Sequence, residues 1–221
     1  MPRRAAARGT HFRTRISIPT PSDPGRRRFL ALTAAAAGAL ILPGAPARAA
    51  TAAQARGLVE ALVAEITATI NSGRSEAQML RGFEQIFLRY ADVAIIAQTT
   101  LGVDWRRAGQ AQRRAYVNAF TGYISRKYGR RFREFIGGRV TVTGVRQVRD
   151  FQEVNSIAEL RGQSPFRVDW LVSDKSGSPK FFNLLVDGVN MLATERAEIG
   201  AMLDRRGGDI DGLIADLGRS G

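Results

Sequence analysis

The chain has 221 residues and a mass of 24.1 kDa, the size of one ordinary domain or two small ones. Hydrophobic residues make up 44% and charged residues 24%, a balance typical of a globular protein. The sequence has no cysteine, which excludes disulfides, thiolate metal sites, a cysteine nucleophile and a lipidated N-terminal cysteine. Its one histidine, His11, lies in a leader that we expect to be removed, so most catalytic triads and imidazole metal sites are excluded as well.

Residues 1–49 have the features of an N-terminal extension followed by an export signal. The arginines at 26–28 precede a weakly apolar stretch of about a dozen residues, which is too short to span a membrane. The small residues Ala47 and Ala49 place the predicted cleavage before Ala50. The arginine pair followed by Phe-Leu at 29–30 resembles a twin-arginine signal, and an ordinary Sec signal with additional arginines is the alternative.

Removing the leader changes the charge of the protein. The whole chain has 33 basic and 20 acidic residues; nine arginines and Asp23 lie in the leader, so the mature part has 24 and 19, a net charge of +5 rather than +13. Residues 105–139 carry ten positive charges against Glu134 alone. A basic segment often indicates nucleic-acid binding, but an exported protein rarely meets nucleic acid, so we expect no such partner.

The mature chain begins with helical periodicity and changes to strand periodicity after residues 137–138. Helices are predicted at about 51–72, 76–90, 92–102, 110–128, 193–206 and 209–218. Ser75 followed by Gln78 predicts a capping box, and Asp209 predicts a helix cap. Strands are predicted at about 139–148, 153–161, 166–173 and 180–187, with a bulge at Gly144.

Consecutive strands joined by short turns predict an antiparallel sheet. The sequence therefore predicts an α+β fold, a single domain over residues 50–221 in which N- and C-terminal helices pack on a curved, mostly antiparallel sheet of about four strands.

Motifs for nucleotide binding, serine hydrolysis and zinc proteolysis are absent from the sequence. The prominent feature is instead a surplus of large apolar side chains where helices meet the sheet. All four tyrosines lie between positions 90 and 128, with Trp105 among them. Any one of these residues fits a solid core, but together they favour an apolar cavity with tyrosines at its rim.

Two blocks of residues resemble the MlaC family of toluene-tolerance auxiliary proteins. The first block reads DVAIIA at 92–97 and LGVDWRRA at 101–108, leading into the long helix; the second reads VDGVNML at 186–192 and GGDIDGLI at 207–214. The resemblance covers essentially all of residues 51–218. One departure is Asn183-Leu184, where many members have an aspartate–valine pair.

The resemblance implies a non-enzymatic periplasmic carrier, a monomer that moves phospholipid between an outer-membrane lipoprotein complex and an inner-membrane ABC transporter with an MCE-domain protein. Such a carrier maintains outer-membrane lipid asymmetry. The fold would then enclose an apolar lipid pocket, with phospholipid as cargo and no cofactor or metal. The expected lining is Phe83, Phe87, Tyr90, Ile95, Leu101, Trp105, Tyr116, Phe120, Tyr123, Ile124, Tyr128, Val140, Val142, Val168, Trp170, Phe182, Leu184 and Met191.

The basic segment is the predicted surface for docking a partner, and part of it could approach the lipid phosphate. The predicted docking residues are Arg113, Arg114, Arg126, Arg130 and Arg131. The alternative is a solvated helix face whose last arginines lie favourably at the negative end of the helix dipole.

Three other functions are compatible with the sequence. A carrier for a hopanoid or another amphiphile would have the same fold. An enzyme on this scaffold would need a buried acid or base, for which Asp169 and Asp187 are the candidates, although Asp169 alternates with the apolar face and is expected to point outward. A third alternative is a binding protein without a ligand.

Overall fold

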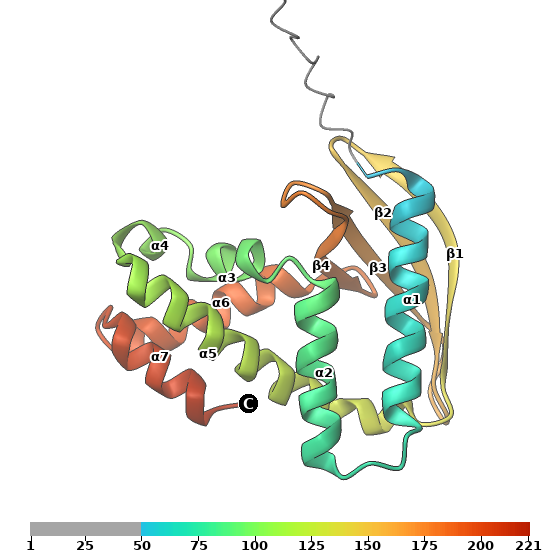
Figure 1. Cartoon of the computed structure of the whole chain (residues 1–221), viewed down its shortest axis with the longest axis horizontal. Helices are drawn as coiled ribbons and strands as arrows, with labels where there is room; N and C mark the ends of the chain where they lie inside the picture. Colours follow the sequence, from blue (N-terminus) through green and yellow to red (C-terminus); the bar gives the residue numbers. More distant parts are fainter. Residues whose placement is uncertain (1–49) are drawn as a thin grey trace, which may run out of the picture. The chain divides into compact units, whose positions relative to one another are not determined.

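The computed structural model describes residues 50–221, without the side chains of 132–134, so the predicted leader lies outside the described residues. Figure 1 shows an α+β domain of helices packed on an antiparallel sheet. The helices are α1 (Ala52–Ile70), α2 (Glu76–Tyr90), α3 (Val93–Leu101), α4 (Asp104–Arg107), α5 (Gln110–Gly129), the 3-10 helix η1 (Arg130–Phe135), α6 (Met191–Arg205) and α7 (Ile210–Arg219). The strands are β1 (Arg139–Val148), β2 (Phe151–Glu159), β3 (Phe166–Ser173), β4 (Lys180–Val186) and β5 (Val189–Asn190).

Local sequence signals set the helix ends. Thr51 and Ser75 cap α1 and α2 in capping boxes with Gln54 and Gln78, so the box predicted at Ser75 is confirmed. The predicted cap at Asp209 is also confirmed, because its side chain accepts a hydrogen bond of 3.0 Å from the backbone of the first turn of α7.

The sheet has the order β1-β2-β3-β4-β5, and each neighbouring pair is antiparallel. The register of β1 shifts between Val142 and Gly144, which confirms the predicted bulge. The four predicted strands are confirmed, and β5 adds a fifth. A strand of two residues is too short to show a periodicity in the sequence.

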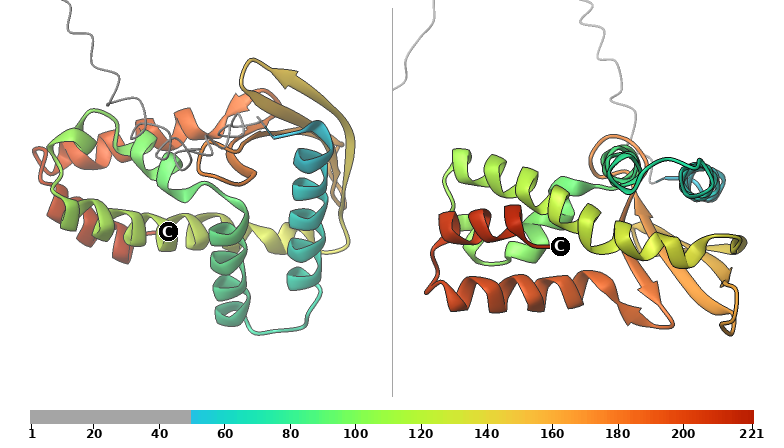
Figure 2. Two further views of the ribbon diagram at one scale, coloured as in Figure 1. Left: turned by 45° about the horizontal axis from the view of Figure 1, so that its top comes forward. Right: turned by 90° about the horizontal axis from the view of Figure 1, so that it is seen from below.

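The helices lie on one face of the sheet, here called the inner face. Figures 1 and 2 show α1 along β1 and β2, with α2 running antiparallel beside α1. Further along the chain, α5 packs on α7 and α3 packs on α6 in a separate helical layer. The buried residues of the inner face include Val154, Ser156, Ala158, Val168, Trp170 and Val172.

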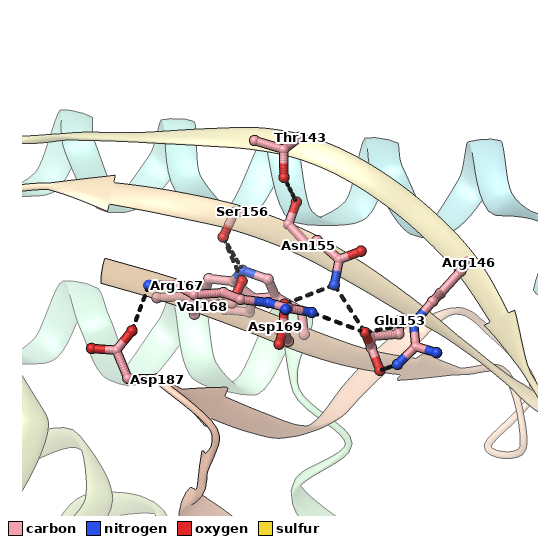
Figure 3. A network of polar contacts seen from close by, with 10 residues as sticks. Thr143, Arg146, Glu153, Asn155, Ser156, Arg167, Val168, Asp169 and Asp187 are labelled. Carbon is pink, nitrogen blue, oxygen red and sulfur yellow. Dashed lines mark hydrogen bonds and ion pairs between the residues drawn. The ribbon is translucent and has the colours of Figure 1, made fainter. Parts of the chain in front are cut away.

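The opposite, outer face carries a ladder of polar contacts across three strands (Figure 3). Arg146 on β1 donates two hydrogen bonds, of 2.8 and 2.7 Å, to the carboxylate of Glu153 on β2. Asn155 donates to Glu153 Oε1 at 2.9 Å and to Asp169 Oδ1 at 2.7 Å, and Arg167 Nε donates to the same Asp169 oxygen at 2.7 Å. Because the flanking arginines cover Glu153 and Asp169, both carboxylates are buried on a face that no helix of the described chain covers.

Neither acid considered for catalysis faces the helices. Asp169 points outward as predicted, because its neighbours Val168 and Trp170 point inward, but it is 5% exposed and bound to Arg167. Asp187 lies exposed in the turn after β4, where its Oδ1 accepts a hydrogen bond of 2.8 Å from the backbone of Arg167.

Candidate functional site

A cavity of about 590 Å³ lies between the inner face of the sheet and helices α1, α2, α5 and α6. This volume is within the range of about 300–1,000 Å³ that is typical of small-molecule sites. Apolar side chains make up most of the lining. The cavity can therefore take an apolar ligand or the apolar part of an amphiphile.

The apolar stripes of the helices line this cavity. Leu62, Ile66 and Ile70 recur at helical spacing along α1 and line the cavity from one side. Phe83 and Phe87 do the same from α2. The sheet closes the opposite wall, where Trp170 packs edge-on against Phe181 with ring centroids 5.7 Å apart.

Many of the residues predicted from the sequence line this cavity. They are Phe83, Phe87, Phe120, Ile124, Tyr128, Val140, Val168, Trp170, Phe182, Leu184 and Met191. They come from α2, the second half of α5, strands β1, β3 and β4 and the start of α6, so the fold brings together residues that are far apart in the sequence.

The other predicted lining residues lie elsewhere in the fold. They are Tyr90, Ile95, Leu101, Trp105, Tyr116, Tyr123 and Val142. Tyr116 is fully buried between α3 and α5, where its hydroxyl is 2.9 Å from Thr100 Oγ1 and its ring stacks on Phe120. Leu101 is buried in the same helical layer, at the end of α3.

Two of the three tyrosines that lie outside the cavity bind glutamates and are not at its rim. The hydroxyl of Tyr90 donates a hydrogen bond of 2.7 Å to Glu65, and that of Tyr123 donates one of 2.7 Å to Glu198. Trp105 lies under Arg113, whose guanidinium carbon is 5.3 Å from the ring centroid. The two glutamates therefore satisfy the hydroxyl groups of Tyr90 and Tyr123 away from the cavity.

Several lining residues were not predicted as part of the site. They are Leu62, Val63, Ile66, Thr67, Ile70, Ile86, Ile96, Ser125, Gly129, Phe135, Gly138, Arg139, Leu160, Gln163, Phe166, Phe181, Asn183, Val186, Val189, Leu192 and Glu195, whereas Arg131, which also lines the cavity, was predicted as a docking residue. The stripe on α1 is visible in the sequence, but an apolar stripe has the same periodicity whether it faces a solid core or a cavity.

Some of the lining residues are exposed to solvent, and these exposed residues are here called the cavity rim. The cavity rim consists of Thr67, Arg131, Arg139, Gln163 and Val189. Arg139 forms an ion pair with Glu159 at 3.0 Å, whereas Arg131 makes no hydrogen bond or ion pair with the side chains that the structure describes. The rim is therefore polar and basic, in contrast to the apolar wall.

A partly buried ionic cluster lies beside the cavity, between α5 and α6. Lys127 Nζ donates to Glu195 Oε1 at 2.7 Å and to Glu198 Oε2, and Tyr128 also donates to Glu195. Burial lowers the pKa of Lys127, but these glutamates raise it more, so the lysine stays charged. Burial and the bond to Glu198 raise the pKa of Tyr123 to about 12.

Glu195 has the most buried carboxylate of this cluster. The residue is 4% exposed, and its Oε2 has no hydrogen-bond partner within the described part of the chain. Glu195 and Tyr128 both belong to the cavity lining, so the cluster joins the cavity wall to the helical layer behind it.

The family model described as MlaC protein matches residues 47–219. The chain belongs to the MlaC family. MlaC proteins are non-enzymatic lipid carriers, which confirms the prediction that this chain is not an enzyme.

A solved structure from Ralstonia solanacearum is similar to this MlaC-family chain. It is described as a phospholipid-binding protein in complex with a phospholipid. The TM-score is 0.65 at 21% sequence identity, and the match covers 74% of this chain and 94% of that chain. The likeness confirms the predicted α+β fold.

Two of the arginines predicted to dock a partner have structural roles in this MlaC-family protein. Arg113 Nε donates to the carbonyl of Trp105 at 2.9 Å. Arg126 donates to the carbonyls of Leu217 and Ser220, at 2.5 and 2.7 Å, and so caps the C-terminal end of α7. Both arginines are half-buried, and changing them would disturb the fold.

The other three docking candidates are exposed but do not form one compact patch. Arg114 lies near the start of α5, whereas Arg130 and Arg131 follow its end, so roughly 24 Å of helix separates them. Arg131 belongs to the cavity rim, and Arg130 lines a small cleft beside Glu76.

Neither metal ligation nor membrane insertion has structural support within residues 50–221. In this part of the chain, no three histidine, cysteine, aspartate or glutamate residues lie close enough together to hold a metal ion. None of its helices has the length and apolar character needed to cross a membrane.

Proposed function

We propose that this protein is a periplasmic carrier that holds the acyl chains of a phospholipid in the 590 Å³ cavity. The observation that carries the proposal is this apolar cavity in a chain that belongs to the MlaC family. The similar Ralstonia solanacearum protein, which contains a phospholipid, supports the same choice of cargo.

The proposed carrier moves lipid between an outer-membrane lipoprotein complex and an inner-membrane ABC transporter with an MCE-domain protein, and it maintains the lipid asymmetry of the outer membrane. Membership of the MlaC family supports these partners. We propose that the protein acts as a monomer. Each acyl CH₂ that leaves water contributes about 0.8 kcal/mol, so burial of the tails stabilises the loaded carrier.

Docking on the membrane partners is proposed for the exposed arginines only. The guanidinium groups of Arg114 and Arg130 bind no side chain in the described part of the protein and can meet an acidic surface, whereas Arg113 and Arg126 bind backbone carbonyls. Such charges mainly raise encounter rates, and their effect weakens with salt.

The test of the proposed cargo is native mass spectrometry of the purified protein and of variants that fill the cavity. Val168→Trp and Ile66→Trp add a large side chain to opposite walls of the cavity. Leu88→Trp is the matched control, because Leu88 is 46% exposed on α2 and does not line the cavity. We expect a bound phospholipid mass in the wild type and in the control, and its loss in both cavity variants.

Each other outcome identifies a different function. A triterpenoid mass would favour the hopanoid carrier, and a wild-type protein that binds nothing would favour a binding protein without a ligand. If the cavity variants keep their lipid, or unfold because the site is a solid core, the lipid does not lie in this cavity. Overpacking a solid core costs about 1–3 kcal/mol, which a denaturation curve would detect.

Export to the periplasm is proposed to follow the twin-arginine route, with cleavage before Ala50. Changing Arg26 and Arg27 to lysine keeps the positive charge but removes the arginine pair that the receptor reads. We expect unprocessed protein in the cytoplasm, detected by fractionation and immunoblotting. Normal processing of this variant would show that the leader is a Sec signal, which needs only positive charge before an apolar core.

A further inference from the structure

The rim of the cavity is basic where the proposed cargo would reach solvent. Arg131 and Arg139 both line the cavity and are both exposed. A third guanidinium lies nearby, because Arg161 packs over Gly137, where a Cβ would be 2.8 Å from its Nε. Gly137 has φ +73° and precedes the lining residue Gly138, so the turn before β1 brings Arg161 next to the rim.

Only part of this positive charge is neutralised by the side chains that the structure describes. Glu159 accepts two hydrogen bonds from Arg139, at 3.2 and 3.0 Å, which leaves other N–H groups of that guanidinium available. Arg131 has no such partner among the described side chains. The rim therefore offers donors with the geometry that suits a phosphate.

The described side chains of the cavity lining include a single carboxylate, that of Glu195, which is not among the exposed rim residues. Its Oε1 accepts hydrogen bonds from Lys127 and Tyr128, and its Oε2 is buried, so neither oxygen is open to an ammonium at the rim. The uncharged polar rim residues, Thr67 and Gln163, can bind hydroxyl groups but cannot neutralise an ammonium.

We infer that the cavity rim selects phospholipids with a net anionic headgroup over zwitterionic ones. This inference rests on the proposed function, since it requires the acyl chains to lie in the cavity. The phosphate binds Arg131 and Arg139, and a neutral glycerol beyond it meets the hydroxyl and amide groups of the rim. An ethanolamine ammonium in the same place meets guanidinium groups and no solvent-exposed carboxylate of the described lining, so the zwitterionic lipid binds less tightly.

The test is a competition between two lipids with identical acyl chains. Delipidated protein is loaded from vesicles of equal parts dioleoyl phosphatidylglycerol and dioleoyl phosphatidylethanolamine, and the bound ratio is measured by mass spectrometry. We expect enrichment of phosphatidylglycerol by the wild type. The proposed ion pair between each rim arginine and the lipid phosphate is exposed to solvent, so its contribution is small. We therefore expect Arg131→Ala to lower the bound ratio of phosphatidylglycerol to phosphatidylethanolamine by about threefold to fivefold. The Arg131→Ala/Arg139→Gln double variant is expected to lower it further.

The matched control is Arg81→Ala, which removes an exposed arginine of α2 that does not line the cavity. We expect the bound ratio of this variant to equal that of the wild type. Total bound lipid stays the same in all variants, because the acyl chains supply the affinity. A wild-type ratio equal to that of the vesicles, or an equal change in the control, would overturn the inference.

A second loading experiment separates selection by the headgroup from binding to the membrane surface. Loading is repeated from nonionic detergent micelles that contain the same two lipids. The surface density of anionic headgroups on these micelles is low. A preference seen with vesicles but lost with micelles would show that the arginines bind the membrane surface, and it would overturn selection by the headgroup. Failure of the wild type to bind either lipid would instead contradict the proposed function itself.

Discussion

The helical layer and the cavity contain the same kinds of side chain but differ in packing. In the layer of α3, α5, α6 and α7, large side chains such as Tyr116, Ile199, Leu213 and Leu217 are fully buried and fill the interior. Between the sheet and α1, α2, α5 and α6, equally large side chains surround a cavity of about 590 Å³. Apolar content alone therefore does not determine whether a region becomes a core or a cavity.

The difference in packing between the two regions follows from which structural element lies opposite each apolar side chain. In the helical layer α5 packs on α7 and α3 on α6, so the side chains of one helix fill the grooves of the next. In the other region α1 lies along β1 and β2 while α2 packs on α1 and α5, and side chains of α1, α2 and β3 line the cavity instead of filling it. The long helix α5 belongs to both regions, with Tyr116 in the core and Tyr128 at the cavity.

The largest effect is expected where the two regions meet, at the ionic cluster of α5 and α6. Lys127→Met removes the cation but leaves the buried carboxylate of Glu195, whose Oε2 already has no partner among the described residues. Breaking a buried pair in this way costs about 3–5 kcal/mol. We expect a loss in the lower part of this range by chemical denaturation, because the lysine side chain is 26% exposed.

The conservative variant Lys127→Arg is the control for this prediction. It keeps the positive charge, and it is expected to retain most of the stability. Equal losses in the two variants would mean that the lysine acts through its packing rather than its charge.

Truncation of one leucine in each region tests the comparison directly. Leu213 on α7 is fully buried in the helical layer, so Leu213→Ala is expected to cost about 3 kcal/mol, because it opens a new hole in a filled core. Leu184 on β4 lines the cavity, so Leu184→Ala only enlarges a space that exists and is expected to cost about 1 kcal/mol.

Both variants are to be measured by denaturation of delipidated protein, because a bound ligand adds to the apparent stability. Equal costs for the two substitutions would contradict the distinction between core and cavity. With lipid bound, the cost of Leu184→Ala is expected to rise, since the leucine then contacts cargo.

The smallest of these effects concerns the outer face of the sheet, which is polar where the inner face is apolar. Arg146 lowers the pKa of Glu153 below its ordinary value of 4.5, against the opposing effect of burial. A lowered pKa in the folded state gives stability that is fully present above pH 4.5 and is lost as the pH falls through the folded-state pKa.

Glu153→Gln tests this contribution. We expect the variant to be about 1 kcal/mol less stable than the wild type at pH 7, the upper range for an ion pair with an exposed partner. The difference should shrink as the pH falls below 4.5, and denaturation curves at several pH values would measure it. Other acids with lowered pKa, such as Glu198, titrate in both proteins, so a difference that stays constant with pH would exclude the ion pair as its cause.

The fold could be predicted from the sequence because its signals are local. Capping residues such as Ser75 and Asp209 mark helix starts, and alternation from Phe166 to Ser173 marks a strand. The bulge at Gly144 was visible as a glycine within an alternating strand. By contrast, the short α4 and η1 and the two-residue β5 do not present enough residues to show a period.

The site could be predicted only in part, because the tertiary structure decides which side chains face the cavity and which face the solid core. Phe87 and Tyr116 look equivalent in the sequence, since each lies on the apolar stripe of a helix, but only Phe87 faces the cavity. The structural roles of Arg113 and Arg126 could not be seen either, because their acceptors are backbone carbonyls of other segments. No side-chain pattern in the sequence marks such acceptors.

The two tryptophans of the chain divide between the regions, and this gives the protein an internal optical reporter. Trp170 lies in the cavity wall with its Nε1 donating to Ser156 Oγ at 3.0 Å, whereas Trp105 lies under Arg113 outside the cavity. In a Trp105→Phe protein, all tryptophan fluorescence would arise from the wall of the cavity in which we propose that the acyl chains lie. Loading and release could then be followed in real time without a labelled lipid.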